Sequence, residues 1–131
     1  MNNSDKFSIK KRIHSFRFAF NGIRNLILQE HNARIHMVAL ACVIGLGIFL
    51  KINLLEWSAI SIVSGLVILT ELLNTAIEKL TDFIEPEWNN KIGQIKDFCA
   101  GAVFISAIVS LIVGSLIFIP KIIEIIKHMG N

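Results

Sequence analysis

The sequence lacks most of the features that mark a soluble nucleotide-binding protein or a disulfide-stabilised one. Its two cysteines, Cys42 and Cys99, lie in or beside apolar runs without CxxC spacing, which favours packing over a disulfide or a metal site. A GxxxxGK[ST] loop and a GxGxxG loop are both absent, as are internal repeats, low-complexity tracts and Gly/Ser linkers. The 131 residues predict a single domain, 1–131, without a familiar phosphate-binding loop.

Charged residues are scarce over three long stretches. The hydrophobic share of 53% exceeds that of a typical soluble domain, and the mean hydropathy is +0.63. The stretch from Phe98 to Ile119 has no charge, and as a helix it would be about 33 Å long, against a hydrocarbon core of about 30 Å. We therefore predict an all-α membrane protein whose transmembrane helices cover residues 35–50, 54–82 and 97–119.

The basic residues are distributed unevenly around these stretches. Seven precede the first stretch, one follows it, three separate the second from the third, and two lie in the tail: Lys6, Lys10, Lys11, Arg12, Arg17, Arg24 and Arg34; Lys51; Lys79, Lys91 and Lys96; Lys121 and Lys127. By the positive-inside rule, the N-terminus and the segment 79–97 are expected in the cytoplasm. The polar N-terminal segment has no compact apolar region and no cleavage site, so no signal peptide is expected.

The N-terminal segment has a helical periodicity. Its large apolar residues recur at steps of four and three, and its basic residues follow a separate stripe: Ile9, Ile13, Phe16, Phe20, Ile23 and Ile27 against Lys10, Arg17 and Arg24. This pattern predicts an amphipathic helix over residues 5–30 on the cytoplasmic membrane surface, where anionic headgroups attract it. A plain juxtamembrane anchor is the alternative. Glu30 is the only acid between Asp5 and Glu56.

The second apolar stretch ends in a polar stripe, ELLNTAIEKLTD. At 100° per residue its four polar positions fall within an arc of roughly 80° on one helix face: Glu71, Asn74, Glu78 and Asp82. Glu71 would lie about 25 Å along the span from Leu54, inside the bilayer. Because an ionised carboxylate there costs a few kcal/mol or more, Glu71 should face a bundle interior and have a partner.

A stripe that grades from a buried acid to surface acids suits a divalent cation at the membrane interface. Mg²⁺ takes oxygen ligands and is typically held by one or two carboxylates together with substrate phosphates. The alternative is a polar helix end, in which Glu78 and Asp82 are solvated and paired with Lys79 or Lys96. For Asp82 both interpretations stay open, whereas the depth of Glu71 favours a function.

Several motifs carry a resemblance to a known family. The pattern E-x-x-N-T-A-I-E-x-x-x-D at 71–82 is followed by Lys96-Asp97 and by AGAV at 100–103, and the N-terminal part contains SFRFAFNGI at 15–23 and E-x-N-x-R-I-H at 30–36. Together they resemble the prokaryotic diacylglycerol kinase and undecaprenol kinase family of small integral-membrane lipid kinases. The N-terminal motifs are more similar to the undecaprenol kinase branch, and the resemblance extends from Lys11 to about Lys121.

The resemblance implies a homotrimer in the bacterial inner membrane, with one surface helix and three transmembrane helices per subunit. It also implies transfer of the γ-phosphoryl group of ATP to a lipid hydroxyl, with no nucleic acid partner. Glu71 would be the catalytic general base, Glu30 and Glu78 would bind Mg²⁺, and Asp82 would be a supporting acid. The nucleotide-binding residues would be Lys11, Phe18, Asn74, Glu87, Trp88, Asn89, Lys96 and Asp97. The family often has arginine and tyrosine at the first two of these positions.

The sequence has three other interpretations besides a lipid kinase that acts on undecaprenol. The same kinase could act on diacylglycerol. A small proton or cation conductor would use Glu71 as a relay, but nothing ionisable lies between Trp57 and Thr70 to continue it. An assembly factor would use the polar stripe only to hold helices together.

The remaining polar and aromatic residues near the spans have simpler interpretations. His31 and His36 are expected to be satisfied interfacial histidines, because five residues of spacing put them on different helix faces. Trp57 and Trp88, near the two ends of the second span, are more typical of interface anchors than of base-stacking platforms.

Overall fold

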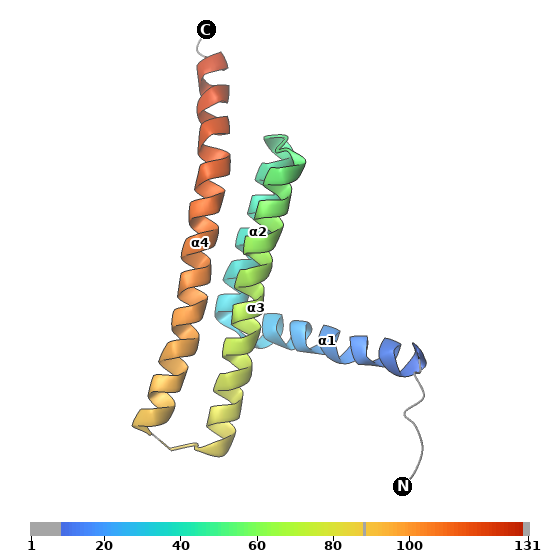
Figure 1. Cartoon of the computed structure of the whole chain (residues 1–131), viewed down its shortest axis with the longest axis vertical. Helices are drawn as coiled ribbons and strands as arrows, with labels where there is room; N and C mark the ends of the chain where they lie inside the picture. The colour runs from blue at the N-terminus through green and yellow to red at the C-terminus, as the bar shows by residue number, and fades with distance from the viewer. Residues whose placement is uncertain (1–8, 88, 130–131) are drawn as a thin grey trace.

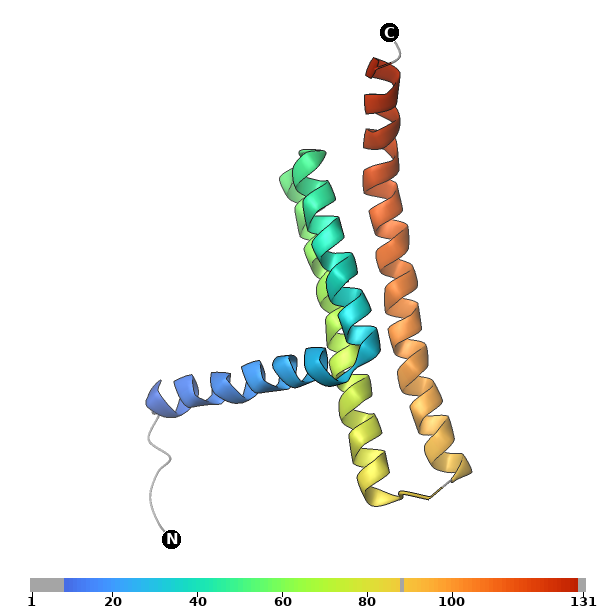
Figure 2. The same cartoon turned by 180° about the vertical axis from the view of Figure 1, so that it is seen from behind.

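The described part of the chain consists of helices joined by short turns. The computed structural model describes residues 9–87 and 89–129, with side chains from residue 13 onward. These residues form four helices and no strand: α1 (Ile9–Gln29), α2 (His31–Phe49), α3 (Leu54–Ile84) and α4 (Asn90–Met129). Helices α2, α3 and α4 run side by side, and α1 points away from them across the long axis (Figure 1, Figure 2). The predicted all-helical architecture is confirmed.

The three bundle helices are long and apolar enough to cross a bilayer. They contain 19, 31 and 40 residues. At 1.5 Å per residue, α3 and α4 would be about 46 and 60 Å long, which exceeds the hydrocarbon core of about 30 Å. Both helices therefore extend beyond the hydrocarbon. The polar half of the α3 stripe is at the end of α3 that leads into the turn to α4.

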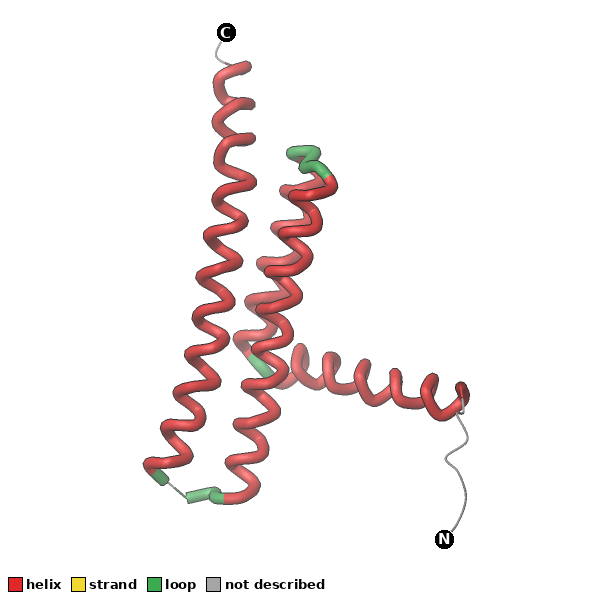
Figure 3. Tube along the Cα trace, in the orientation of Figure 1, coloured by secondary structure: helices red, strands yellow, loops and turns green. Residues whose placement is uncertain are grey.

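Three ends of the bundle helices differ by several residues from the bounds expected from hydropathy: the start of α2, and both ends of α4, which begins at Asn90 where the predicted span begins at 97. Helix α2 begins at His31, because Glu30 has an extended backbone (φ −100, ψ 124) that separates α1 from α2. Helix α4 continues through Pro120 to Met129 and extends past the α2–α3 turn (Figure 1, Figure 3). A proline removes one backbone hydrogen bond but does not by itself end a helix.

The turn between α2 and α3 is closed by local polar contacts. Lys51 adopts a left-handed backbone conformation (φ 51). The Asn53 side chain accepts from the Glu56 backbone N–H at 3.0 Å, and the Glu56 carboxylate accepts from the Asn53 N–H at 2.6 Å, which forms a capping box. Glu56 also lies 3.2 Å from the Lys121 ammonium. These contacts join all three bundle helices at the end opposite the α3 stripe.

Gly47 supports the close packing of α2 on α3 at this turn. A Cβ added at Gly47 would lie 2.9 Å from Cη2 of Trp57 and 3.0 Å from Cδ1 of Ile52, whereas a Cβ at Gly45 would meet nothing within 4 Å. We expect Gly47→Ala to lower the free energy of unfolding by roughly 1–3 kcal/mol, because the rigid indole must shift. The measurement is the midpoint of thermal unfolding in detergent micelles.

Gly45→Ala is the matched control for this prediction. Alanine is favoured over glycine inside a helix by up to about 1 kcal/mol, so this variant should be as stable as the parent or slightly more stable. Equal midpoints for the two alanine variants would show that Trp57 moves aside without cost.

Candidate active site

The polar stripe of α3 passes from the bundle interior to its surface. Glu71 is only 2% exposed and Thr75 is also buried, whereas Asn74 and Glu78 are half-buried and Asp82 is exposed. Asn74 Nδ2 donates to Glu78 Oε1 at 3.0 Å. The expected gradient from a buried acid to a surface acid is therefore present on one helix.

Helix α2 brings a histidine to the buried end of the stripe. His36 Nε2 lies 3.3 Å from Glu71 Oε1. The two atoms are within ion-pair distance, but they do not meet the directional requirements of a hydrogen bond, because Oε1 has no hydrogen-bond partner among the described residues. The sequence predicts a partner for Glu71 without identifying it, and His36, expected only as a satisfied interfacial histidine, lies within ion-pair distance of it.

The corner between α1 and α2 lies against the surface end of the stripe. Lys79 Nζ is 3.8 Å from Glu30 Oε1 and also donates to the Gln29 side chain. Glu30, which precedes α2, and Glu78, which adjoins Lys79, are therefore at the same end of the bundle. The structure thus forms two levels, His36 with Glu71 inside and Glu30 with Lys79 nearer the surface.

Two buried oxygen atoms of this site have no hydrogen-bond donor among the described residues. They are Glu71 Oε1 and Asn74 Oδ1. Leaving a buried acceptor unpaired costs about 1–3 kcal/mol, so both atoms have unused capacity to accept a proton or a cation. They lie one helical turn apart on the face of α3 that carries Glu78.

The acidic end of α3 is tied to α4 by an ion pair. Lys96 Nζ donates to Asp82 Oδ1 at 2.5 Å, and both side chains are partly or largely exposed. This is the pairing that the polar-helix-end interpretation of Asp82 expects. An exposed pair of this kind contributes about 0–1 kcal/mol, so Lys96 could exchange Asp82 for a phosphate at little cost.

The other predicted nucleotide residues are not gathered around Glu71 within one chain. Phe18 is 65% exposed on α1, where its ring contacts His14 edge to face with centroids 5.3 Å apart. Glu87, Asn89 and Asp97 are exposed around the turn between α3 and α4. The Lys11 side chain and all of Trp88 lie outside the described residues. Phe18 is not near Glu71 because α1 points away from the bundle (Figure 2).

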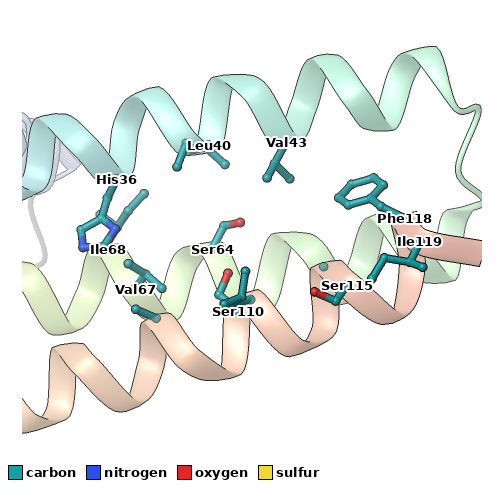
Figure 4. Close-up of a pocket in the computed structure, with 14 residues that line it drawn as sticks. His36, Leu40, Val43, Ser64, Val67, Ile68, Ser110, Ser115, Phe118 and Ile119 are labelled. Carbon is teal, nitrogen blue, oxygen red and sulfur yellow. The ribbon is translucent and has the colours of Figure 1, made fainter. Parts of the chain in front are cut away.

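An apolar groove of about 380 Å³ lies between α2, α3 and α4. Figure 4 shows His36 at one end and Phe118 with Ile119 at the other, with Ser64, Ser110 and Ser115 between them. Next to this groove, Thr70 Oγ1 and Ser106 Oγ are 2.8 Å apart and join α3 to α4. The groove is large enough for part of a lipid chain and ends beside the buried carboxylate.

The predicted metal ligands can be compared with what Mg²⁺ needs. No group of three or more His, Cys, Asp or Glu side chains in this part of the chain is arranged to hold a metal ion. Mg²⁺ is, however, commonly bound by one or two carboxylates plus substrate phosphates and water. Glu30, Glu78 and the unpaired Oδ1 of Asn74 offer oxygen atoms of the kind that Mg²⁺ takes as ligands.

These features define a small integral-membrane protein with a polar site at one end of its bundle and an apolar groove leading to it. Its sequence identifies the family. Residues 17–118 match the family model of prokaryotic diacylglycerol kinase. The chain therefore belongs to the prokaryotic diacylglycerol kinase family and is a membrane lipid kinase.

Two curated relatives agree with this assignment. The chain is 37% identical over 108 residues to the undecaprenol kinase of Bacillus subtilis (strain 168), a match that covers 82% of this chain and 88% of that protein. It is 32% identical over 112 residues to the diacylglycerol kinase of Synechocystis sp., covering 85% of this chain. The chain spans 64% of the length of that second protein. The resemblance noted in the sequence, including its preference for the undecaprenol kinase branch, is confirmed.

Proposed function

We propose that the protein transfers the γ-phosphoryl group of ATP to undecaprenol, which yields undecaprenyl phosphate. The observation that carries this proposal is the buried Glu71 at the end of an apolar groove, because a lipid alcohol needs its hydroxyl at a base and its chain in apolar surroundings. The name and the 37% identity of the Bacillus subtilis relative support undecaprenol as the alcohol.

In this proposal the buried level of the site accepts the proton, and the level nearer the surface holds the metal ion. Glu71 is the base that finally receives the proton of the lipid hydroxyl. Glu30 and Glu78 would hold Mg²⁺, which would supply charge neutralisation for the phosphates of ATP nearer the surface. Phosphoryl transfer depends mainly on such positioning and charge neutralisation. Asn74 donates to Glu78 and so orients one of the two metal ligands.

The nucleotide is proposed to lie at the surface end of the stripe. Lys96 and Asp97 contact it from α4, and the loop residues Glu87, Trp88 and Asn89 flank it, with Asp82 releasing Lys96 to the phosphates. Phe18 is exposed on α1, which points away from the bundle (Figure 2), and the Lys11 side chain lies outside the described residues. A homotrimer would let α1 of one subunit reach the site of the next, which the exposed apolar side chains of α1 support: Ile13, Phe16, Phe18, Phe20 and Ile23.

The proposed location is the bacterial inner membrane, with the N-terminus and the active site in the cytoplasm. The excess of basic residues before α2 and between α3 and α4 supports this orientation. ATP is a cytoplasmic substrate, so the same orientation gives the site access to its co-substrate.

The substrate assignment is tested by comparing two lipid alcohols. We expect phosphorylated product from both undecaprenol and diacylglycerol with Mg-ATP, and a higher kcat/KM for undecaprenol in the same mixed micelles. A preference for diacylglycerol would overturn the choice of alcohol but leave the phosphoryl transfer standing, because the proposed metal and base act only on the phosphates and the hydroxyl. Absence of product from both alcohols would overturn the proposed reaction.

A further inference from the structure

His36 stands between the apolar groove and the buried carboxylate. The imidazole is 26% exposed and lines the groove, whereas Glu71 is 3% exposed at its side chain and is not among the residues that line it. Because His36 Nε2 is 3.3 Å from Glu71 Oε1, a hydroxyl that enters along the groove meets the imidazole before it meets the carboxylate.

The cavity that touches Glu71 directly is too small for a lipid. A second cavity touches both Glu71 and His36, but its volume is about 10 Å³ and it is lined mainly by apolar residues of α1 and α2, including Leu26 and Ala33. A single water molecule already needs about 10–15 Å³ of such space, so a lipid headgroup cannot enter there. Of these two cavities, only the groove is large enough to bring a lipid hydroxyl toward the carboxylate.

We propose that His36 relays the proton of the lipid hydroxyl to Glu71, an inference that rests on the proposed function. The hydroxyl O–H bond breaks and its proton moves to Nδ1 of His36, while the proton on Nε2 moves to Oε1 of Glu71. The hydroxyl oxygen forms a bond to the γ-phosphorus, and the bond from that phosphorus to the bridging oxygen breaks, with its electron pair leaving on ADP. His36 starts and ends neutral and changes only its tautomer.

The chemistry of the two side chains suits this relay. A neutral imidazole has one donor and one acceptor nitrogen, so it can take a proton on one side and give one on the other. Glu71 Oε1 has no hydrogen-bond donor among the described residues, so it is free to receive that proton. Protonation also neutralises the buried carboxylate, and a buried negative charge is costly to maintain in an apolar site. The present contact is looser than a hydrogen bond, as catalytic contacts often are before substrate binds.

The test is the steady-state kinetics of His36→Ala with undecaprenol and Mg-ATP, with and without added imidazole. We expect kcat to fall at least about tenfold, since general acid–base catalysis contributes about 10²–10⁴-fold, while KM for the lipid changes little. Imidazole should restore part of kcat in this variant, because the space left by the side chain adjoins the groove. Imidazole should not restore Glu71→Gln, which lacks the final acceptor. A purely structural role of His36 would not produce this selective rescue.

Two further variants complete the design. His36→Gln keeps a side chain that can donate to Glu71 but cannot relay a proton, so it should lose kcat as His36→Ala does even if the alanine variant is unstable. His31→Gln is the matched control, because His31 is exposed on the same helix, and it should keep the parent kcat. Parent-like kcat in His36→Gln, or a folded His36→Ala that imidazole does not restore, would overturn the relay. An inactive parent protein would instead overturn the proposed function.

Discussion

Replacing Glu71 by glutamine is expected to lower kcat by about 10²–10⁴-fold, the usual contribution of general acid–base catalysis. The amide has nearly the same shape as the carboxyl group but cannot accept the proton of the lipid hydroxyl. Because Glu71 is only 2% exposed, the substitution also removes a buried charge, so the folded protein should be retained. The measurement is single-turnover phosphoryl transfer to undecaprenol, alongside the affinity for a nucleotide analogue, which should stay unchanged.

Two comparisons make this result specific to the position of the carboxylate. Glu124→Gln removes an acid from an exposed site on α4 and should leave kcat unaltered. Glu71→Asp keeps the charge but withdraws it by one methylene from His36, so its kcat should lie between those of the parent and the glutamine variant. Turnover of Glu71→Gln within a few-fold of the parent would rule out Glu71 as the proton acceptor.

The helical architecture follows from hydropathy because the membrane imposes it. A backbone in hydrocarbon must satisfy its own hydrogen bonds, so an uncharged stretch such as 98–119 has to be helical. The helix ends depend on local features that hydropathy does not record. Glu30 interrupts the chain by adopting an extended backbone, and Pro120 lies within α4 instead of ending it.

The α3 stripe was predictable because one helix determines it. Spacing at 100° per residue puts Glu71, Asn74 and Glu78 on one face whatever surrounds the helix, and the observed burial follows that order. The partner of Glu71 depends on how α2 is rotated against α3, which no single-helix pattern contains. The sequence does contain a signal for this pair: His36 is six residues after Glu30, and Glu71 is seven before Glu78. If Glu30 and Glu78 lie at the same end of two antiparallel helices, His36 and Glu71 lie about 9 and 10 Å from that end, at nearly the same depth.

The proposed nucleotide contacts are not assembled around Glu71 in the described residues of one chain. Phe18 is exposed on α1, which points away from the bundle, and Asp97 is exposed near the start of α4 (Figure 1). Their assignment comes from the family motifs and stays a prediction. His36 differs from these residues, because its partner Glu71 lies within the same subunit.

Removing either proposed metal ligand is expected to lower Mg²⁺-dependent kcat by about 10²–10³-fold, since charge stabilisation by a metal ion is worth several kcal/mol. The variants are Glu30→Gln and Glu78→Gln. Both carboxylates would act through one ion, so once the first is lost the second has less left to contribute. The double variant should therefore be clearly more active than the product of the two single losses predicts. Activity measured over a range of Mg²⁺ concentrations should show half-saturation at higher Mg²⁺ in each single variant.

The ion pair between Glu30 and Lys79 offers a competing explanation for a loss of activity in Glu30→Gln. A Lys79 variant distinguishes the two explanations. If Glu30 served only to hold Lys79, whose Nζ is 3.8 Å away, then Lys79→Met would lose as much activity as Glu30→Gln. We expect Lys79→Met to lose little, because the pair is about half exposed on the lysine side and such pairs contribute about 0–1 kcal/mol. Its Mg²⁺ dependence should match that of the parent. Strictly multiplicative losses in the Glu30 and Glu78 double variant would place the two carboxylates in separate sites, since residues that do not share a ligand or a contact act independently.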